Sequence, residues 1–168
     1  MTPASRFSTA RLRADRIDSG DFTDLRRMHA DPEVMKTLGG LRSEEQTREY
    51  LQANLEHWDR YGFGLWILRE LAGSAMIGRS ALRHVDIEGR PEIELGYALF
   101  PDYWGRGFAT EAVKAMLELA FEQLAISELV AFCLPDNAAS RRVIEKSGGI
   151  FEREALHCGL RHVLYRFR

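Results

Sequence analysis

The sequence predicts one α+β domain over residues 1–168, built on a mixed, mostly antiparallel sheet of about seven strands with helices on both faces. The length suits a single domain, and the composition, 45% hydrophobic and 29% charged, is that of a folded globular chain. The expected elements follow the order β-αα-βββ-α-β-α-ββ. One helix stands between two strands in the middle of this order and implies a single parallel strand pair, so the other pairs are expected to be antiparallel.

The first half of the chain begins with one strand and two helical regions and then changes to strands. Ser43 and Gln46 have the spacing of a capping box, which marks the start of a long helix. Asp18 can cap an earlier helix. From Gly64 onward the pattern is typical of strands. The expected elements are a strand at residues 7–14, a helix at 18–29, a helical turn at 31–40, a helix at 43–60, and strands at 65–71, 75–85 and 92–100.

The second half opens with the strongest helical pattern. Ala112, Val113, Met116, Leu117 and Ala120 recur at steps of three and four residues, so they share one helix face. A glycine pair at residues 148–149 favours the end of a later helix, because glycine readily takes left-handed backbone angles. The expected elements are a helix at residues 108–124, a strand at 128–134, a helix at 137–146, and strands at 151–155 and 162–167.

Charge and hydropathy argue against several classes of protein. The 23 basic and 25 acidic residues leave a net charge of −2, which gives no general electrostatic case for a nucleic-acid partner. No apolar run is long enough for a membrane span or a signal peptide, so a cytoplasmic protein without a membrane partner is expected. Two cysteines and five scattered histidines show no metal-ligand spacing, and no metal is expected. Cys133 lies in an apolar run and is expected in the core.

The densest functional signal is a glycine-rich turn between a strand and the helix at residues 108–124. It reads Tyr103-Trp104-Gly105-Arg106-Gly107-Phe108-Ala109-Thr110. The two glycines allow a tight turn and a close approach of a ligand to the backbone. The amides that follow are unpaired donors at a helix N-terminus, where the helix dipole is positive. The turn is therefore expected to bind an anion, most suitably a phosphate, and Arg106 adds a formal charge.

Two general phosphate motifs fit this turn poorly. The Walker A pattern G-x-x-x-x-G-K-[ST] does not occur in the sequence. Gly105 and Gly107 meet the first two positions of the dinucleotide fingerprint G-x-G-x-x-G, but Thr110 stands at the third. A doubly wound dinucleotide fold would also alternate strands and helices from its start. A nicotinamide-dependent oxidoreductase is therefore the weaker interpretation, and a titration with NADH would test it.

The same segment resembles a known family. Residues 106–109, Arg-Gly-Phe-Ala, resemble the R-G-x-G/A core of the GNAT superfamily of acetyl-CoA-dependent N-acetyltransferases. Gly96-Tyr97, residues 103–112, residues 137–148 and residues 9–13 resemble its RimJ/RimL-like branch. The resemblance covers nearly the whole chain and implies a GNAT-like fold that agrees with the order of elements above. It implies one N-acetyltransferase domain with acetyl-CoA as cosubstrate.

The resemblance also implies how the coenzyme is bound. The backbone amides of residues 105–110 would hold its pyrophosphate, the strand that ends at residues 99–100 would pair with its pantetheine amides, and Asn137 would hydrogen-bond the same arm. Gly96 is compatible with a bulge or a close approach in that strand. Basic residues of the helix at 137–146 could meet the 3′-phosphate or form a charged outer face without a ligand. The expected coenzyme-binding residues are Leu99, Phe100, Gly105, Arg106, Gly107, Phe108, Ala109, Thr110, Asn137 and Arg141.

Transfer to an amine also needs groups that handle protons. An ammonium has no free electron pair, so a base must take its proton, directly or through water. Glu92 and Glu94 lie on one side of the strand expected beside the coenzyme, and Glu94 is nearer the reactive end and is the first candidate. Many family members protonate the departing thiolate with a tyrosine, but the matching position here is Ile144. Ser140 resembles the serine given that role in RimL-like enzymes and is the substitute candidate.

Two functions remain open from the sequence. The first is an N-acetyltransferase that moves the acetyl group directly from the thioester to a primary amine, on a protein N-terminus or a small molecule. The second is a catalytically silent module that binds coenzyme A for regulation, which Ile144 favours. In that case Glu94 is an ordinary strand carboxylate and Ser140 a helix serine that bonds locally. The acceptor is not recognisable in the sequence, and either a monomer or a homodimer is expected.

Overall fold

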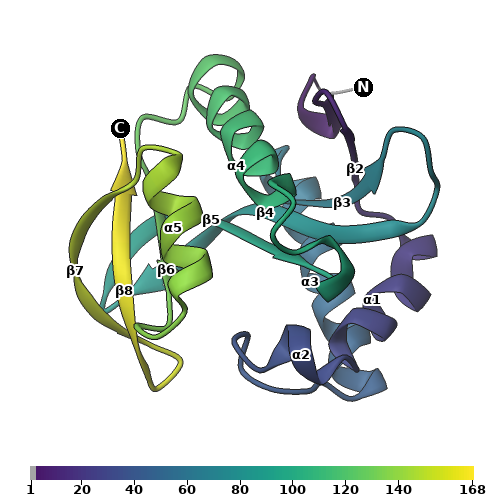
Figure 1. Ribbon diagram of the computed structural model, residues 1–168, viewed down its shortest axis with the longest axis horizontal. Coiled ribbons are helices and arrows are strands. Elements are labelled where there is room, and N and C mark those ends of the chain that lie inside the picture. The colour runs from purple at the N-terminus through teal and green to yellow at the C-terminus, as the bar shows by residue number, and fades with distance from the viewer. Residues whose placement is uncertain (1–2) are drawn as a thin grey trace.

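The computed structural model describes residues 3–168 and contains an eight-stranded sheet (Figure 1). The strand order is β1-β2-β3-β4-β5-β6-β8-β7, and β5 and β6 are the one parallel pair in it. The α+β class and the mostly antiparallel sheet are therefore confirmed. The strands are β1 (Arg6–Ser8), β2 (Leu12–Arg16), β3 (Leu65–Glu70), β4 (Met76–Ile87), β5 (Arg90–Leu99), β6 (Leu129–Cys133), β7 (Ile150–His157) and β8 (Leu160–Phe167).

Helices cover both faces of the sheet, as predicted (Figure 1). On one face Tyr97 of β5 reaches Ser140 of α5, and α4 packs beside α5. On the other face Arg79 of β4 lies against the ring of Tyr50 in α3, and α1 packs on α3. The α-helices are α1 (Phe22–His29), α2 (Pro32–Met35), α3 (Glu44–Tyr61), α4 (Phe108–Glu118) and α5 (Ala138–Lys146).

The strand predicted at residues 7–14 is instead a hairpin of β1 and β2, which is why the sheet has eight strands rather than about seven. The amide of Thr9 donates to the carbonyl of Leu12 (2.8 Å), and the amide of Leu12 donates to Oγ1 of Thr9 (3.0 Å). A threonine side chain that bonds a nearby backbone group favours a turn over a continuous strand. The weak alternation of residues 7–14 does not reveal this competing bond.

The helix starts follow the capping signals of the sequence. Ser43 and Gln46 form the predicted capping box at the start of α3. Asn137 caps α5 through Oδ1, which accepts from the amide of Ser140 (3.1 Å). Asp18 caps a short 3₁₀ turn that leads into α1, rather than α1 itself. The capping residues in the sequence therefore predict the first residue of each of these helices to within a few positions.

The helix predicted at residues 108–124 is α4 followed by a π-helical turn, Leu119–Gln123. In this turn the amide of Leu124 donates to the carbonyl five residues earlier (3.1 Å). The buried face of α4 packs toward a core that contains Trp58, Trp66 and Phe108 among its largest side chains. None of the helices in residues 3–168 is long and apolar enough to cross a membrane.

Candidate active site

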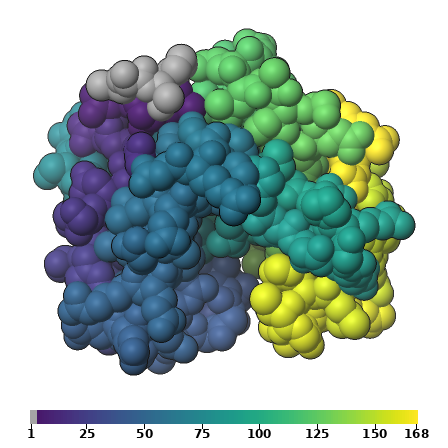
Figure 2. Space-filling view, turned by 180° about the vertical axis from the view of Figure 1, so that it is seen from behind, coloured from purple at the N-terminus to yellow at the C-terminus, as the bar shows by residue number. Residues whose placement is uncertain are grey.

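A cavity of about 1,100 Å³ lies where β5 and β6 separate. The two strands share one registered pair, Glu94 with Val130, although β5 runs on to Leu99 and β6 to Cys133. Residues of both strands beyond this pair line the cavity, together with the turn before α4, α5, the segment after α2 and the β7–β8 hairpin. From behind, the surface is hollowed between the blue helices of the first third of the chain and the yellow final strands (Figure 2). The cavity thus passes through an opening in the sheet.

The glycine turn before α4 presents unpaired amides to this cavity. Gly105 and Gly107 have φ of +68° and +83°, a left-handed conformation that favours glycine, and Gly107 supplies no capping side chain. The amide of Glu111 donates to the carbonyl of Gly107 (3.0 Å) as the first bond of the helix. The preceding amides have no partner within the helix and belong to Phe108, Ala109 and Thr110. This arrangement favours an anion at the start of α4.

The β1–β2 hairpin braces the glycine turn from outside the cavity. Arg11 donates through Nη1 to the carbonyl of Arg106 (2.9 Å) and through Nε to Glu111 (2.8 Å). Its guanidinium also lies over the ring of Phe108, 4.1 Å from the centroid. Thr9 Oγ1 donates to Glu111 as well. A segment about 100 residues earlier in the chain therefore holds the turn and the first turn of α4 in place.

The backbone of β5 limits which of its residues can pair with a ligand. The amide of Phe100 donates to Ile77 of β4 (2.9 Å), and its carbonyl accepts from the amide of Tyr103 (3.0 Å). Both backbone groups of Phe100 are engaged, which argues against the pantetheine pairing predicted for it. Because backbone groups alternate in direction along a strand, those of Leu99 face the opening. The carbonyl of Leu99 already accepts from Nε1 of Trp104 (2.8 Å), so its amide is the group that faces a ligand.

Glu94 and Gly96 fit together on the α3 face of β5. Arg83 lies opposite Glu94 in the β4–β5 ladder, and its Nε donates to Oε2 at 2.6 Å. A Cβ atom added to Gly96 would lie 3.2 Å from Oε1 of Glu94. The ladder runs unbroken through Gly96 and Ala81, so there is no bulge at this position against β4. The glycine instead leaves room for the buried carboxylate, and both residues line the cavity.

Ser140 lines the cavity from the α5 face, opposite Glu94. Oη of Tyr97 lies 2.8 Å from Oγ of Ser140, and burial raises the pKa of Tyr97 to about 12. Cys133 also lines the cavity, but burial raises the pKa of its thiol to about 11, so it stays protonated near neutral pH. Asn137 lines the cavity while it caps α5 through Oδ1, and its Nδ2 has no hydrogen-bond partner within residues 3–168.

Neither of the two predicted coenzyme-binding arginines lines the cavity. Arg106 donates weakly to a main-chain carbonyl of the 3₁₀ turn before it (3.4 Å). Arg141 donates to Oη of Tyr165 (3.1 Å), on the side of α5 that faces β8. Arg142 and Lys146 of the same helix do line the cavity. The geometry therefore favours these two residues over Arg141 as partners for a phosphate in the cavity.

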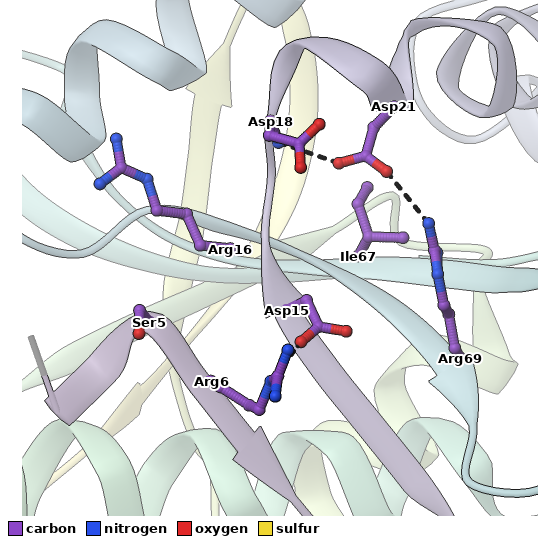
Figure 3. Close-up of a pocket in the computed structure, with 8 residues that line it drawn as sticks. All are labelled: Ser5, Arg6, Asp15, Arg16, Asp18, Asp21, Ile67 and Arg69. Carbon is purple, nitrogen blue, oxygen red and sulfur yellow. Dashed lines mark hydrogen bonds and ion pairs between the residues drawn. The ribbon is translucent and has the colours of Figure 1, made fainter. Parts of the chain in front are cut away.

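A smaller hollow of about 320 Å³ lies beside β2 and β3 (Figure 3). Two ion pairs join four of its charged side chains, and Arg16 pairs with Asp59 outside the hollow. Arg6 Nε lies 2.5 Å from Asp15, and Arg69 Nη2 lies 3.0 Å from Asp21. Neither this hollow nor any other part of residues 3–168 contains a group of three or more histidine, cysteine or acidic side chains arranged to hold a metal ion. None of the predicted site residues lines this hollow.

Sequence reasoning missed three residues that shape the site, and one of them could have been found. The two-residue turn at residues 88–89 places residue 87 opposite residue 90, so the same register predicts Arg83 opposite Glu94. Alternation along β5 puts Tyr97 on the face opposite Glu94, but no local pattern points to its bond with α5. Arg11 contacts a segment about 100 residues away, and one sequence shows no sign of such a pair.

Comparison with known proteins agrees with this geometry. Residues 11–150 match the family described as Acetyltransferase (GNAT) domain. YkkB of Bacillus subtilis is 32% identical over 149 residues, which make up 88% of this chain and 87% of that protein. An acetyltransferase structure from Agrobacterium tumefaciens is 28% identical, with a TM-score of 0.85 over 97% of this chain and 94% of that one.

RimL, a ribosomal L7/L12 alpha-N-protein acetyltransferase solved in complex with coenzyme A, has the same fold at 19% identity. Its TM-score is 0.79, and the match covers 95% of this chain and 94% of that one. The family match spans most of the chain and includes the glycine turn, α4 and α5. This chain therefore belongs to the GNAT family of N-acetyltransferases.

Proposed function

We propose that this enzyme transfers the acetyl group of acetyl-CoA directly to a primary amine in the cavity between β5 and β6. The observation that carries the proposal is the meeting of three features in one cavity: an open helix N-terminus, a gap between parallel strands, and polar side chains on both sides of that gap. Each feature suits one part of the reaction. The acceptor is a protein N-terminus or a small molecule.

The first feature suits the coenzyme. The amides at the start of α4 would bind its pyrophosphate, and Arg142 and Lys146 would meet its 3′-phosphate. The amide of Leu99 and Nδ2 of Asn137 would donate to the carbonyls of the pantetheine arm. Acetyl-CoA would supply an activated thioester when bound. RimL, which shares the fold, was solved in complex with coenzyme A, and this supports coenzyme A as the ligand.

Glu94 is the proposed base. Arg83 holds Oε2, which fixes the carboxylate and leaves Oε1 beside Gly96. As the amine nitrogen bonds to the acetyl carbon and the carbon–sulfur bond breaks, the amine must lose a proton. Oε1 of Glu94 would accept this proton, directly or through water. The carboxylate lies on the α3 face, so the acceptor would enter from that face.

Ser140 is the proposed hydrogen-bond donor to the departing thiolate. A pKa of about 12 makes Tyr97 a weaker acid than a thiol, whose ordinary pKa is about 8.5. Tyr97 therefore stays protonated near neutral pH. Its hydroxyl holds Ser140 Oγ at 2.8 Å and orients it. A hydrogen bond to a charged group is worth about 1.5–3 kcal/mol, which sets the scale of the contribution from Ser140.

The test is thiol release from acetyl-CoA in the presence of primary amines, measured together with formation of the acetylated amine. Direct transfer predicts that the two products form in equal amounts and that neither forms without an amine. A silent regulatory module, the alternative favoured by Ile144 at the position of the usual tyrosine, would bind coenzyme A and release no thiol with any amine. That result would contradict the proposed function.

A further inference from the structure

Three arginines line the α3 side of the cavity, and only one of them, Arg83, has a role in acetyl transfer to a simple amine, because it holds Glu94. Arg42 follows α2, and Arg79 and Arg83 belong to β4; all three line the cavity. In the β4–β5 ladder Arg79 lies opposite Ala98 and Arg83 lies opposite Glu94. Side chains of opposed residues share a face, so both arginines lie on the face of the sheet that carries Glu94. Arg42, Arg79 and Arg83 are called the arginine cluster below.

Arg79 is a buried cation without a counter-ion. It is only 4% exposed, and its Nε has no hydrogen-bond partner. Within residues 3–168, neither Arg79 nor Arg42 forms an ion pair, and Arg83 pairs with Glu94 alone. A buried charge without a partner destabilises a folded chain. Its presence on a cavity wall therefore points to a ligand that carries the opposite charge.

The neighbouring side chains do not neutralise Arg42 or Arg79. Arg42 and Arg79 both face the ring of Tyr50, with Cζ 4.6 Å and 5.6 Å from its centroid, which is a weak attraction. The hydroxyl of Tyr50 is itself buried without a partner. Nη1 of Arg42 donates to Nε2 of His29 (3.0 Å). Burial and the charges of nearby arginines lower the pKa of His29 to about 3, so this histidine is neutral.

We propose that the acceptor is an amino acid, whose carboxylate binds to Arg79 and Arg42 while its amine faces Glu94. This inference rests on the proposed function. The forked donors of a guanidinium match the two oxygens of a carboxylate. Glu94 on the same face attracts an ammonium and repels a carboxylate, so the two ends of an amino acid are sorted by charge. Because Arg79 is almost fully buried, a carboxylate reaches it only on a molecule that enters the cavity.

Paired acceptors test this inference in the activity assay. Each natural L-amino acid is compared with its own amide, which keeps the amine and the side chain but removes the carboxylate. A charged hydrogen bond predicts that at least one amino acid exceeds its amide in kcat/KM by roughly 10- to 150-fold. Arg79→Met should bring this ratio close to one and leave the rate with the amide unchanged. Equal rates for every acid and amide, or an unchanged ratio in Arg79→Met, would overturn the inference.

A binding measurement separates this inference from the proposed function. N-Acetylglycine and N-acetylglycinamide are titrated into the protein with coenzyme A present. Preferential binding of the carboxylate, lost in Arg79→Met, supports the anion site even if no amine is acetylated. Equal binding of both probes counts against the site, whatever the activity assay shows. If Arg79→Met does not fold, Arg42→Met replaces it in both assays.

Arg69→Met is the matched control. Arg69 is also a poorly exposed arginine on a strand that neighbours β4, but it pairs with Asp21 at 3.0 Å and does not line the cavity. The control should keep the preference for carboxylates in both assays. A loss of preference in Arg69→Met equal to that in Arg79→Met would show a general effect of removing an arginine, and would overturn the assignment to Arg79.

Discussion

Replacement of Glu94 by glutamine separates the role of this side chain as a base from its role in the fold. Arg83 Nε donates to Oε2 at 2.6 Å, and glutamine retains an oxygen that accepts the same bond. The variant loses the negative charge and the basic oxygen beside Gly96, so Arg83 keeps a hydrogen-bond acceptor but no ion-pair partner, and the folding of the variant is checked by its thermal unfolding. A positioned base contributes about 10²- to 10⁴-fold, so kcat/KM near pH 7 should fall by that factor. The loss should shrink as pH rises toward the pKa of the amine, because the neutral amine then becomes abundant.

The assay is the pH–rate profile of thiol release with one working amine, measured for the parent, Glu94→Gln and Glu92→Gln. Glu92 is the matched control, because it lies on the same strand face two residues earlier, pairs with Arg166 at 2.9 Å and does not line the cavity. Glu92→Gln should stay close to the parent. A Glu94→Gln enzyme within about twofold of the parent from about pH 6 to about pH 9 would refute the assignment of the base to Glu94.

Further variants test the glycine turn, the thiolate donor and the buried histidine. Gly107→Val should lower coenzyme affinity in calorimetry, because φ of +83° disfavours valine and the turn would be distorted. Gly62→Val is the control, because Gly62 has φ of +74° but lies outside the cavity, and it should leave the affinity unchanged. Equal affinity in a folded Gly107→Val protein would contradict the assignment of coenzyme binding to this turn. Ser140→Ala should lower kcat roughly 10- to 150-fold, and high pH should not restore the rate. Tyr97→Phe should lower kcat roughly 2- to 12-fold. Full rates in both variants would mean that solvent, and not Ser140, donates to the departing thiolate. His29, with its pKa lowered to about 3, must stay neutral in the folded state while the unfolded chain takes up a proton below about pH 6.5. The free energy of unfolding should therefore fall by about 2 kcal/mol between about pH 7 and about pH 5, and urea titrations should find a smaller fall in His29→Gln.

The parts of the fold that the sequence predicts well depend on local signals. The capping box of Ser43 and Gln46 needs only residues three apart, and the glycine turn needs only a strand, two glycines and a helix. Each of these features is decided by bonds within one segment. The hairpin at residues 6–16 shows the limit, because one bond at Thr9 overrides a weak strand pattern.

The site was only partly predictable because its chemistry depends on which distant side chains meet. Helical periodicity points Arg141 and Arg142 in different directions but does not show which direction faces the cavity; the first turns toward β8 and the second lines the cavity. Arg79 stands in a buried strand, where a sequence gives no reason to expect an unpaired charge. The role proposed for Arg79 depends on the cavity that β4 borders. That cavity forms where β5 and β6 separate, which no local sequence pattern shows.

The most direct test of direct transfer follows the acetyl group by mass spectrometry. The enzyme is mixed first with acetyl-CoA alone and then with acetyl-CoA and an amine. We predict that the intact mass of the protein is unchanged by acetyl-CoA alone, because the pKa of Cys133 is raised to about 11 and its thiol is a poor nucleophile. On addition of the amine, one acetylated amine should form for each free thiol. A protein that gains an acetyl group, at Cys133 or elsewhere, and then passes it to the amine would contradict direct transfer.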